Sequence, residues 1–447
     1  MQTRYLQKCI TVLFIIVLLS GCSGEKSILP ALPKDGKGKI KVMAYHEQTF
    51  QQKFGDLFAV KYPEVDIEVV GMDLLRDRSP EDNPGDKLIS FIEKENPDLI
   101  LLDAEQIAPL VDKGKLLQLD AVMKQEQFDT TGIPTLTMDF FRQLGDGQIY
   151  ALSPTYNVSA IYYNEDLFRE HGIEPPRNQM TWEELFLLAS RFGQLSTEQN
   201  PLYGISTLFS NPMDILMNVA QTKELRIIDN GGDKLLFDSD AWKEAYSVVT
   251  DTIKAKGFYM ADGTVESISV NDTMFAKRQS AMTISHATLA KTLQGDSSFK
   301  VGLVTMPINP TNPEVSPFMS FDNMYGINAD SPNKRIAWEL LSHMCSPEMA
   351  KAFISGYGLS LPIRNEGITE IGGMPAEPFT MLKPYASGDS GWGILDKIKV
   401  SPEFQGQVYD SMNQALVTIV KENVPVDAAL EAMQKELQER LDLEKRK

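Results

Sequence analysis

The chain has 447 residues, of which 43% are hydrophobic, and it carries 61 acidic against 43 basic side chains, a formal net charge of −18. Such hydrophobic content, with charges spread along the chain, is typical of a globular protein and argues against disorder. The length predicts two domains of ordinary size. Nucleic acid and anionic lipid are poor partners for so acidic a surface.

The amino terminus has the layout of a signal peptide. Arg4 and Lys8 precede an apolar run over residues 10–19, and this run falls well short of the roughly twenty residues that cross a bilayer as a helix. Leu19-Ser20-Gly21-Cys22 then resembles the lipobox of bacterial lipoproteins. The resemblance implies a signal peptide of residues 1–21 and acylation of Cys22. A non-lipidated signal peptide or an amino-terminal anchor helix is the alternative.

The other cysteines agree with this interpretation. Cys9 leaves with the signal peptide and Cys22 is acylated, so Cys345 remains alone and no internal disulfide is expected. Cys345 ends an apolar helical pattern and is predicted to pack as a small hydrophobe. Residues 22–37 are rich in Gly, Pro, Ser and Lys and are predicted to tether the lipid to the fold.

Strand and helix patterns alternate from about residue 40 onward. Residues 40–44 and 65–72 have the alternation of strands, and a helical pattern over 50–63 separates them. Residues 96–103, NPDLILLD, are almost wholly apolar, which predicts a strand covered on both faces. The alternation continues to about residue 192 and indicates an α/β architecture with parallel sheets.

Several helix boundaries are marked by capping residues. Thr181 with Glu184 forms the pattern of a capping box. Ser331-Pro332 and Ser346-Pro347 each place a capping hydroxyl before a proline, which predicts helices that begin at the prolines. Two further helical patterns close the chain, one through Val408 to Ile419 and one through Val426 to Leu437.

The sequence offers little support for catalysis. His46-Glu47 begins like a zinc-protease motif, but the position of the second ligand is Phe50. Gly204 to Leu208 lacks the final glycine of a nucleophile elbow, and no phosphate-binding loop is present. We therefore expect no metal and no cofactor. A pair of carboxylates could still serve a glycosidase, but the chain lacks an eightfold barrel rhythm.

Residues 147–192 resemble the extracellular solute-binding proteins of ABC transporters, in the family 1 branch of maltose- and oligosaccharide-binding proteins. The similarity extends over most of the chain from about residue 40, through NPDLILLDAEQIAPLVDKGKLLQL, LLFDSDAWKEAYSVV, MFAKRQSAM, FKVGLVTMP and MYGINADSPNKRIAWELLSHMCSPEMA. The residues that match within 147–192 are Pro154, Tyr162-Tyr163-Asn164, Gly172, Pro176 and Thr181-Trp182-Glu183-Glu184-Leu185.

The resemblance implies an α/β fold of the periplasmic-binding-protein type II, in which two lobes joined by a hinge hold the ligand in the cleft between them. The first lobe would comprise residues 38–152 and 307–360, and the second lobe residues 153–306 and 361–447. The chain would cross the hinge near ALSPTYN and again near LVTMPIN.

The same resemblance implies that the cleft is lined just beyond the ends of several strands. The residues expected there are His46, Glu47, Asp103, Glu105, Tyr156, Asn157, His286, Trp392 and Tyr409.

Structural roles are the alternative for several of these residues. Asp103 could end a strand and cap the next helix, and Trp392 could pack against a lobe. Tyr162 and Tyr163 point to opposite faces of a strand and are expected in the core. The chain also departs from sugar-binding relatives, because Ser285-His286-Ala287-Thr288 stands where they have a tryptophan. A ligand smaller or more polar than a long oligosaccharide is therefore conceivable.

The sequence thus predicts a lipid-anchored, extracytoplasmic, monomeric protein without catalytic activity at the cell membrane. It would capture a small solute, a mono- or oligosaccharide in the first place, and deliver it to the permease subunits of an ABC importer. Two alternatives remain, a sensor or interaction lipoprotein with a solute-binding fold and an anchored glycan hydrolase.

Overall fold

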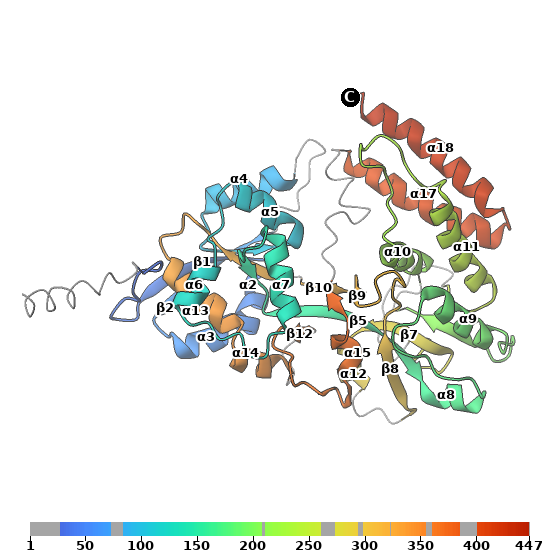
Figure 1. Ribbon diagram of the computed structural model, residues 1–447, viewed down its shortest axis with the longest axis horizontal. Coiled ribbons are helices and arrows are strands. Elements are labelled where there is room, and N and C mark those ends of the chain that lie inside the picture. Colours follow the sequence, from blue (N-terminus) through green and yellow to red (C-terminus); the bar gives the residue numbers. More distant parts are fainter. Residues whose placement is uncertain are drawn as a thin grey trace, which may run out of the picture.

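The protein consists of two α/β lobes, each built on its own sheet, which lie next to each other along the long axis of the molecule (Figure 1). The structure is a computed structural model, and it describes residues 27–72, 84–207, 211–260, 273–293, 298–321, 323–354, 360–384 and 400–446. Within these ranges no helix is both long and apolar enough to span a membrane.

The first lobe contains a five-stranded sheet with the order β2-β1-β3-β11-β4. Its strands are β1 (Gly38–Ala44), β2 (Val65–Gly71), β3 (Leu99–Leu102), β4 (Ala151–Leu152) and β11 (Met324–Ile327). β1 pairs with β2 and β3 in parallel, and β11 is antiparallel to β3 and β4. All four residues of β3 are buried, which confirms the prediction of a strand covered on both faces.

Helices cover both faces of this sheet (Figure 1). They are α2 (Glu47–Phe50), the π-helical turn η1 (Gln51–Gly55), α3 (Asp56–Lys61), α4 (Pro84–Glu95), α5 (Ala104–Asp112), α6 (Asp120–Gln125), α7 (Thr135–Leu144), α13 (Lys334–Met344) and α14 (Pro347–Ala352).

One predicted helix start is wrong. α13 begins at Lys334 rather than at Pro332. The hydroxyl of Ser331 accepts from the backbone N–H of Asn333 at 2.9 Å and donates to Oδ1 of the buried Asp98 at 2.6 Å, so it holds a turn that precedes the helix. The prediction for Ser346-Pro347 is confirmed, since the Ser346 hydroxyl accepts from the backbone N–H of Met349.

The second lobe contains a six-stranded sheet in which β5 (Thr155–Asn164) is central. The order is β10-β5-β7-β6, and β8 and β12 also pair with β5. The other strands are β6 (Tyr203–Ser206), β7 (Ser280–His286), β8 (Val301–Thr305), β10 (Met319–Ser320) and β12 (Leu361–Pro362). β6 and β7 are parallel, but β5 is antiparallel to β7 and β8. The expectation of purely parallel sheets is therefore wrong, because the apolar pattern of a strand does not record its direction.

Helices and short strand pairs complete the second lobe and the connection between lobes. They are α8 (Glu165–Glu170), α9 (Trp182–Gly193), α10 (Pro212–Thr222), α11 (Asp240–Lys254), α12 (Thr288–Leu293), α15 (Glu377–Thr380), α17 (Pro402–Lys421) and α18 (Val426–Glu444), with the pairs β13 (Glu370–Ile371) and β14 (Met374–Pro375), and β9 (Val315–Ser316) and β15 (Lys383–Pro384). The capping box of Thr181 and Glu184 is confirmed at the start of α9, and so are the two carboxyl-terminal helices.

The core consists of two clusters of buried side chains. The larger cluster contains the core of the first lobe and continues along β5 through Tyr156 and Tyr162 to α12 and α15. The second cluster packs α9, α10, α11, α17 and α18 against β6 and β7. Tyr162 is fully buried (0% exposed), so the prediction that it belongs to the core is confirmed. The chain passes from β4 of the first sheet through residues 153–154 into β5 of the second sheet, and it returns to the first sheet between β10 and β11.

Candidate functional site

In both sheets, polar and aromatic side chains follow the ends of strands that lie at one edge of the sheet. The carboxyl ends of the parallel strands β1 and β3 lie at one edge of the first sheet. In the second sheet, the carboxyl ends of β6 and β7 lie at the same edge as the amino end of β5. Ligands of open α/β sheets bind outside such carboxyl ends, so these two edges are the candidate walls of a ligand site.

The wall of the first lobe begins where β1 ends. His46 and Glu47, which the family resemblance places in the cleft, are exposed at the start of α2. Tyr45, directly before them, is a further candidate that the sequence reasoning missed, because 38% of this large aromatic side chain is exposed at the strand end. Tyr45 also lies near the phenol of Tyr325, whose pKa is raised mainly by burial and additionally by Tyr45. An aromatic residue that closes an alternating strand is the signal that could have identified Tyr45.

Asp103 and Glu105 follow β3 on the same wall. Both side chains are exposed. Asp103 is the N-cap residue of α5 and forms a capping box with Gln106, whose Oε1 accepts from the Asp103 backbone N–H at 3.0 Å. The helix-capping alternative for Asp103 is therefore confirmed, and Glu105 lies in the first turn of the same helix.

The wall of the second lobe centres on His286 at the end of β7. Its side chain is exposed, and its Nδ1 lies 3.2 Å from the hydroxyl of Ser159 on β5. Two residues before Ser159, Asn157 is half-buried and pairs with Ser320 of β10. The structure thus brings two of the predicted residues, Asn157 and His286, to neighbouring positions of one sheet.

Tyr156 faces the interior rather than this wall. Its side chain is 2% exposed, and its hydroxyl accepts from Nδ2 of Asn365 at 2.6 Å. Burial raises the pKa of the Tyr156 phenol far above its ordinary value, so this hydroxyl stays protonated. In this conformation Tyr156 packs between the lobes, near Phe321.

Tyr409 lies on α17 and contributes an exposed aromatic ring. Its side chain is 38% exposed, and its hydroxyl accepts from Nδ2 of Asn211 at 3.2 Å. Asn211 caps α10 through the backbone N–H of Met213. At the nearby end of β6, the buried hydroxyl of Ser206 finds no hydrogen-bond partner among the described residues. Asn211 and Ser206 were not identified from the sequence, because each resembles an ordinary helix cap or strand residue.

Three sequence-derived expectations concern cysteine and tryptophan. Cys22 and Trp392 lie outside the described residues. Cys345 is buried, and burial raises the pKa of its thiol to about 12. The prediction that Cys345 packs as a hydrophobic residue is confirmed.

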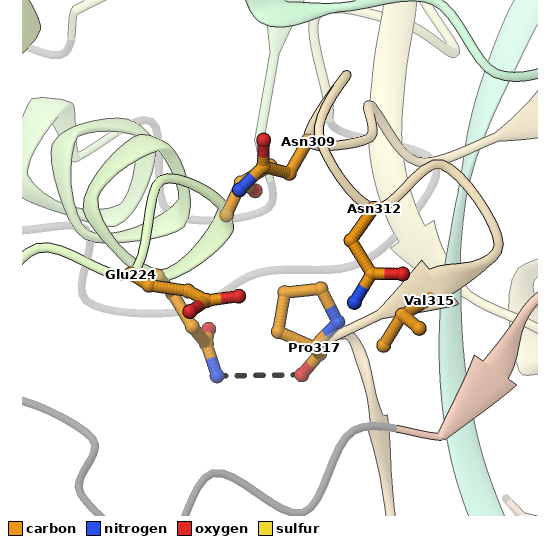
Figure 2. A pocket seen from close by; sticks show the side chains of 7 residues that line it. Glu224, Asn309, Asn312, Val315 and Pro317 are labelled. Carbon is orange, nitrogen blue, oxygen red and sulfur yellow. Dashed lines mark hydrogen bonds between the residues drawn. The ribbon is translucent and has the colours of Figure 1, made fainter.

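Two hollows lie between α10 and residues 308–317, which connect β8 to β10. Glu224, Asn309, Asn312, Val315 and Pro317 surround the first, where Nε2 of Gln221 donates to the carbonyl of Pro317 at 3.3 Å (Figure 2). The second has a volume of about 500 Å³ and is lined by Trp182, Glu183, Thr222, Lys223, Glu244, Ile308, Asn309, Pro310 and Thr311. Of the nine residues predicted to bind the ligand, the eight that the structure describes do not line either hollow.

Comparison with known proteins assigns the family. The sequence profile described as bacterial extracellular solute-binding protein matches residues 78–369. The chain belongs to this family. Membership confirms the resemblance found in the sequence and implies a location outside the cytoplasm.

Curated relatives of this solute-binding protein are distant. Proteins of Brucella abortus and Brucella suis that are named only as binding proteins are 25% identical over 286 residues, which is 61% of this chain. The match covers 63% of the length of these relatives.

Solved structures of similar shape cover nearly the whole chain. They include an ABC substrate-binding protein of Listeria monocytogenes in complex with cycloalternan, which is 19% identical with a TM-score of 0.59 over 91% of this chain and 99% of that one. The sugar-binding protein MalE of Xanthomonas citri is 16% identical with a TM-score of 0.60 over 90% and 97%. UgpB of Mycobacterium tuberculosis in complex with glycerophosphocholine is 17% identical with a TM-score of 0.57 over 91% and 99%. At these identities the similarity shows the fold alone, and it confirms the predicted two-lobe architecture.

Proposed function

We propose that this solute-binding protein is a lipid-anchored receptor that captures a small carbohydrate outside the cytoplasm and delivers it to an ABC importer. The observation that supports this proposal is the composition of the two walls. Imidazole, carboxylate and amide groups lie at the strand ends together with the exposed ring of Tyr45, and the exposed ring of Tyr409 lies on α17 next to the amide of Asn211. Aromatic faces cover the C–H surfaces of sugars, and these polar groups bind hydroxyls.

Similar folds bind ligands of this kind. The Listeria monocytogenes protein binds the cyclic oligosaccharide named in its complex, and the Xanthomonas citri protein is a sugar-binding protein. The Mycobacterium tuberculosis protein instead binds glycerophosphocholine. The family resemblance places a tryptophan of sugar-binding relatives at the segment that contains His286 in this chain. The lack of that stacking ring favours a short sugar or polyol over a long oligosaccharide.

Capture would proceed by closure of the lobes about the crossover segments. A ligand favours the closed form only if it contacts both walls. The first wall would supply His46, Glu47, Asp103 and Glu105, with Tyr45, and the second wall Asn157, His286 and Tyr409. A micromolar dissociation constant corresponds to about 8 kcal/mol, which a few stacked rings and hydrogen bonds provide after the cost of ordering. We propose lobes of 38–152 with 321–360 and of 153–320 with 361–447; the first boundary differs from residue 307 because β10 pairs with β5 of the second sheet.

The protein would act as a monomer without catalysis or cofactor, with the permease subunits of the importer as its partner. The lipobox-like sequence before Cys22 supports anchoring. Acyl chains on this residue would hold the protein at the outer face of the cell membrane.

A thermal-shift screen of the soluble domain tests the ligand class. A sugar at about 100 times its dissociation constant would stabilise the folded state by about 2.7 kcal/mol. An increase in Tm with an amino acid, a polyamine or a metal, and with no sugar or polyol, would show that the carbohydrate assignment is wrong. The anchor is tested separately with Cys22→Ser, which should move the protein from the membrane fraction to the soluble fraction.

A further inference from the structure

The segment between the proposed anchor and the fold is packed against the first lobe. We call residues 27–37 the docked segment. Leu29 is fully buried (0% exposed) in the larger core cluster. The backbone N–H of Ile28 donates to Oε1 of Gln125 at 2.8 Å, and Nε of Arg335 donates to the carbonyl of Pro30 at 2.7 Å. Residues 28–30 of the predicted tether are therefore held against the first lobe, at α6 and α13.

Arg335, which holds the docked segment, is itself fixed by acidic residues. Its two terminal nitrogens each donate to a carboxylate oxygen of Glu126 at 2.7 Å. Glu339 accepts a further bond from Arg335 at 3.3 Å and one from the Tyr62 hydroxyl at 2.6 Å. Only 12% of the Arg335 side chain is exposed, so this bidentate pair is shielded from solvent and more rigid than a surface ion pair.

Little chain separates the docked segment from the proposed anchor. Cys22 precedes Ser27 by five residues, which span at most about 18 Å even when fully extended. The acylated residue cannot move farther than this from the start of the docked segment, whatever conformation the intervening residues adopt. The face of the first lobe at α6 and α13 must then lie close to the lipid.

The chemistry of the docked segment suits a lipid surface. The side chains of Ile28 and Leu32 are 43% and 39% exposed, and those of Lys34 and Lys37 are exposed as well. Within the docked segment, Lys34 and Lys37 face one acid, Asp35, which leaves a local excess of one positive charge in a chain whose net charge is −18. Apolar side chains enter the boundary between headgroups and acyl chains, and lysines are attracted by anionic headgroups.

We propose that the docked segment, together with α6 and α13, is a membrane-facing surface that keeps the first lobe against an anionic phospholipid leaflet. The inference rests on the proposed acylation of Cys22. The second lobe carries α17 and α18 at the end of the molecule remote from β1 and β2 (Figure 1). It is therefore the lobe that moves relative to the membrane when the protein closes.

Energy transfer to labelled lipid tests this orientation. The lipidated full chain, with a donor dye on either Lys124→Cys or Glu439→Cys, is placed in vesicles of phosphatidylglycerol and phosphatidylethanolamine that contain an acceptor lipid. Lys124 lies beside Gln125 on α6, Glu439 lies on α18, and both side chains are exposed. The buried Cys345 is shielded from the dye. We expect stronger transfer from position 124 than from position 439.

A double variant, Gln125→Ala with Arg335→Ala, tests whether the docked segment causes the orientation. In this variant, energy transfer to the labelled lipid should be equal from the two dye positions. Trypsin should also cleave more readily after Lys34 and Lys37. Arg440→Ala is the matched control, because it removes an exposed arginine paired with Glu436 on α18. This variant should keep the stronger energy transfer from position 124.

Vesicle flotation separates failure of the anchor from failure of the orientation. If the protein does not float with the vesicles, the anchor is absent, and both the proposed location and this inference are wrong. If the protein floats but transfer is equal at the two positions, or if the difference persists in the double variant, the anchor stands and the membrane-facing surface is refuted.

Discussion

The hydroxyl of Ser159 lies 3.2 Å from Nδ1 of His286, a contact that joins β5 to the end of β7 at the edge of the second sheet. The backbone at the same position is also held, because the carbonyl of His286 accepts from the Tyr162 hydroxyl at 2.8 Å. A fixed backbone and a hydrogen-bonded ring give the exposed imidazole a defined direction. Such positioning is what a ligand-binding side chain requires.

We predict that His286→Ala weakens ligand binding about fivefold. This corresponds to the loss of one hydrogen bond, worth about 1 kcal/mol. Ser159→Ala should act in the same direction by a smaller amount, since Ser159 only orients the imidazole. Isothermal titration calorimetry with the solute found in the thermal-shift screen measures both effects. His171→Ala is the control, because this exposed histidine follows α8, beyond the opposite end of β5. Equal affinities of His286→Ala and the original chain would remove His286 from the site.

A second prediction concerns the exposed rings of Tyr45 and Tyr409. If these rings stack on a sugar, Tyr45→Ala and Tyr409→Ala should each weaken binding by up to about tenfold, which corresponds to about 1.4 kcal/mol, near the upper limit for such a contact. Tyr409→Phe keeps the ring and removes the hydroxyl that accepts from Asn211, so it should bind much more tightly than Tyr409→Ala. Phe and Ala variants of equal affinity would argue against stacking by this ring.

The two-lobe fold could be predicted because its signals are local and repeated. Apolar β3, the Thr181 capping box and the paired carboxyl-terminal helices all correspond to sequence patterns. Strand direction could not be predicted, since β5 is antiparallel to β7 through pairings more than one hundred residues apart. The start of α13 was misplaced because a capping serine before a proline can also hold a turn, as the Ser331 hydroxyl does with the backbone N–H of Asn333.

The site could be predicted only as a set of strand ends. His46 follows a strand that the alternation reveals, whereas His286 was placed at a strand end by the family resemblance, and both side chains are exposed. The burial of Tyr156 depends on its contact with Asn365, which comes from a segment 209 residues away. Sequence patterns carry no information about such a partner, and the same holds for the bond between Asn211 and Tyr409.

Two glycines provide a matched test of packing. A Cβ added at Gly204 on β6 would lie 2.3 Å from the backbone carbonyl oxygen of Ala189 on α9, whereas a Cβ at Gly406 on α17 would meet no atom within 4 Å. Backbone atoms cannot rotate away, so Gly204→Ala should lower the free energy of unfolding by about 1–3 kcal/mol or more. Gly406→Ala should raise it by about 0.5–1 kcal/mol, because alanine favours the helix. Urea denaturation measures both, and a neutral Gly204→Ala would mean that β6 and α9 separate easily.

The last prediction concerns the pH dependence of stability and rests on His343. This residue lies on α13 beside the Phe58 ring, with a centroid separation of 5.7 Å, and its Nε2 is buried without a hydrogen-bond partner among the described residues. Burial lowers the pKa of His343, the positive charge of Lys61 lowers it further, and Glu348 acts weakly in the opposite direction. The folded state therefore keeps this imidazole neutral at pH values where the unfolded chain already protonates it.

Between the ordinary histidine pKa of about 6.5 and the lower pKa of the folded state, the unfolded chain binds more protons, so the free energy of unfolding falls as the pH falls. The contribution of one residue is at most about 1.4 kcal/mol per pH unit. We expect His343→Gln to reduce the loss of stability between about pH 7.5 and pH 5.5, a range that lies above most carboxylate titrations. Urea denaturation at both pH values measures this loss, and His171→Gln should retain it. If the two variants lose the same stability on acidification, then His343 is not the titrating group, and solvent reaches its imidazole in the folded protein.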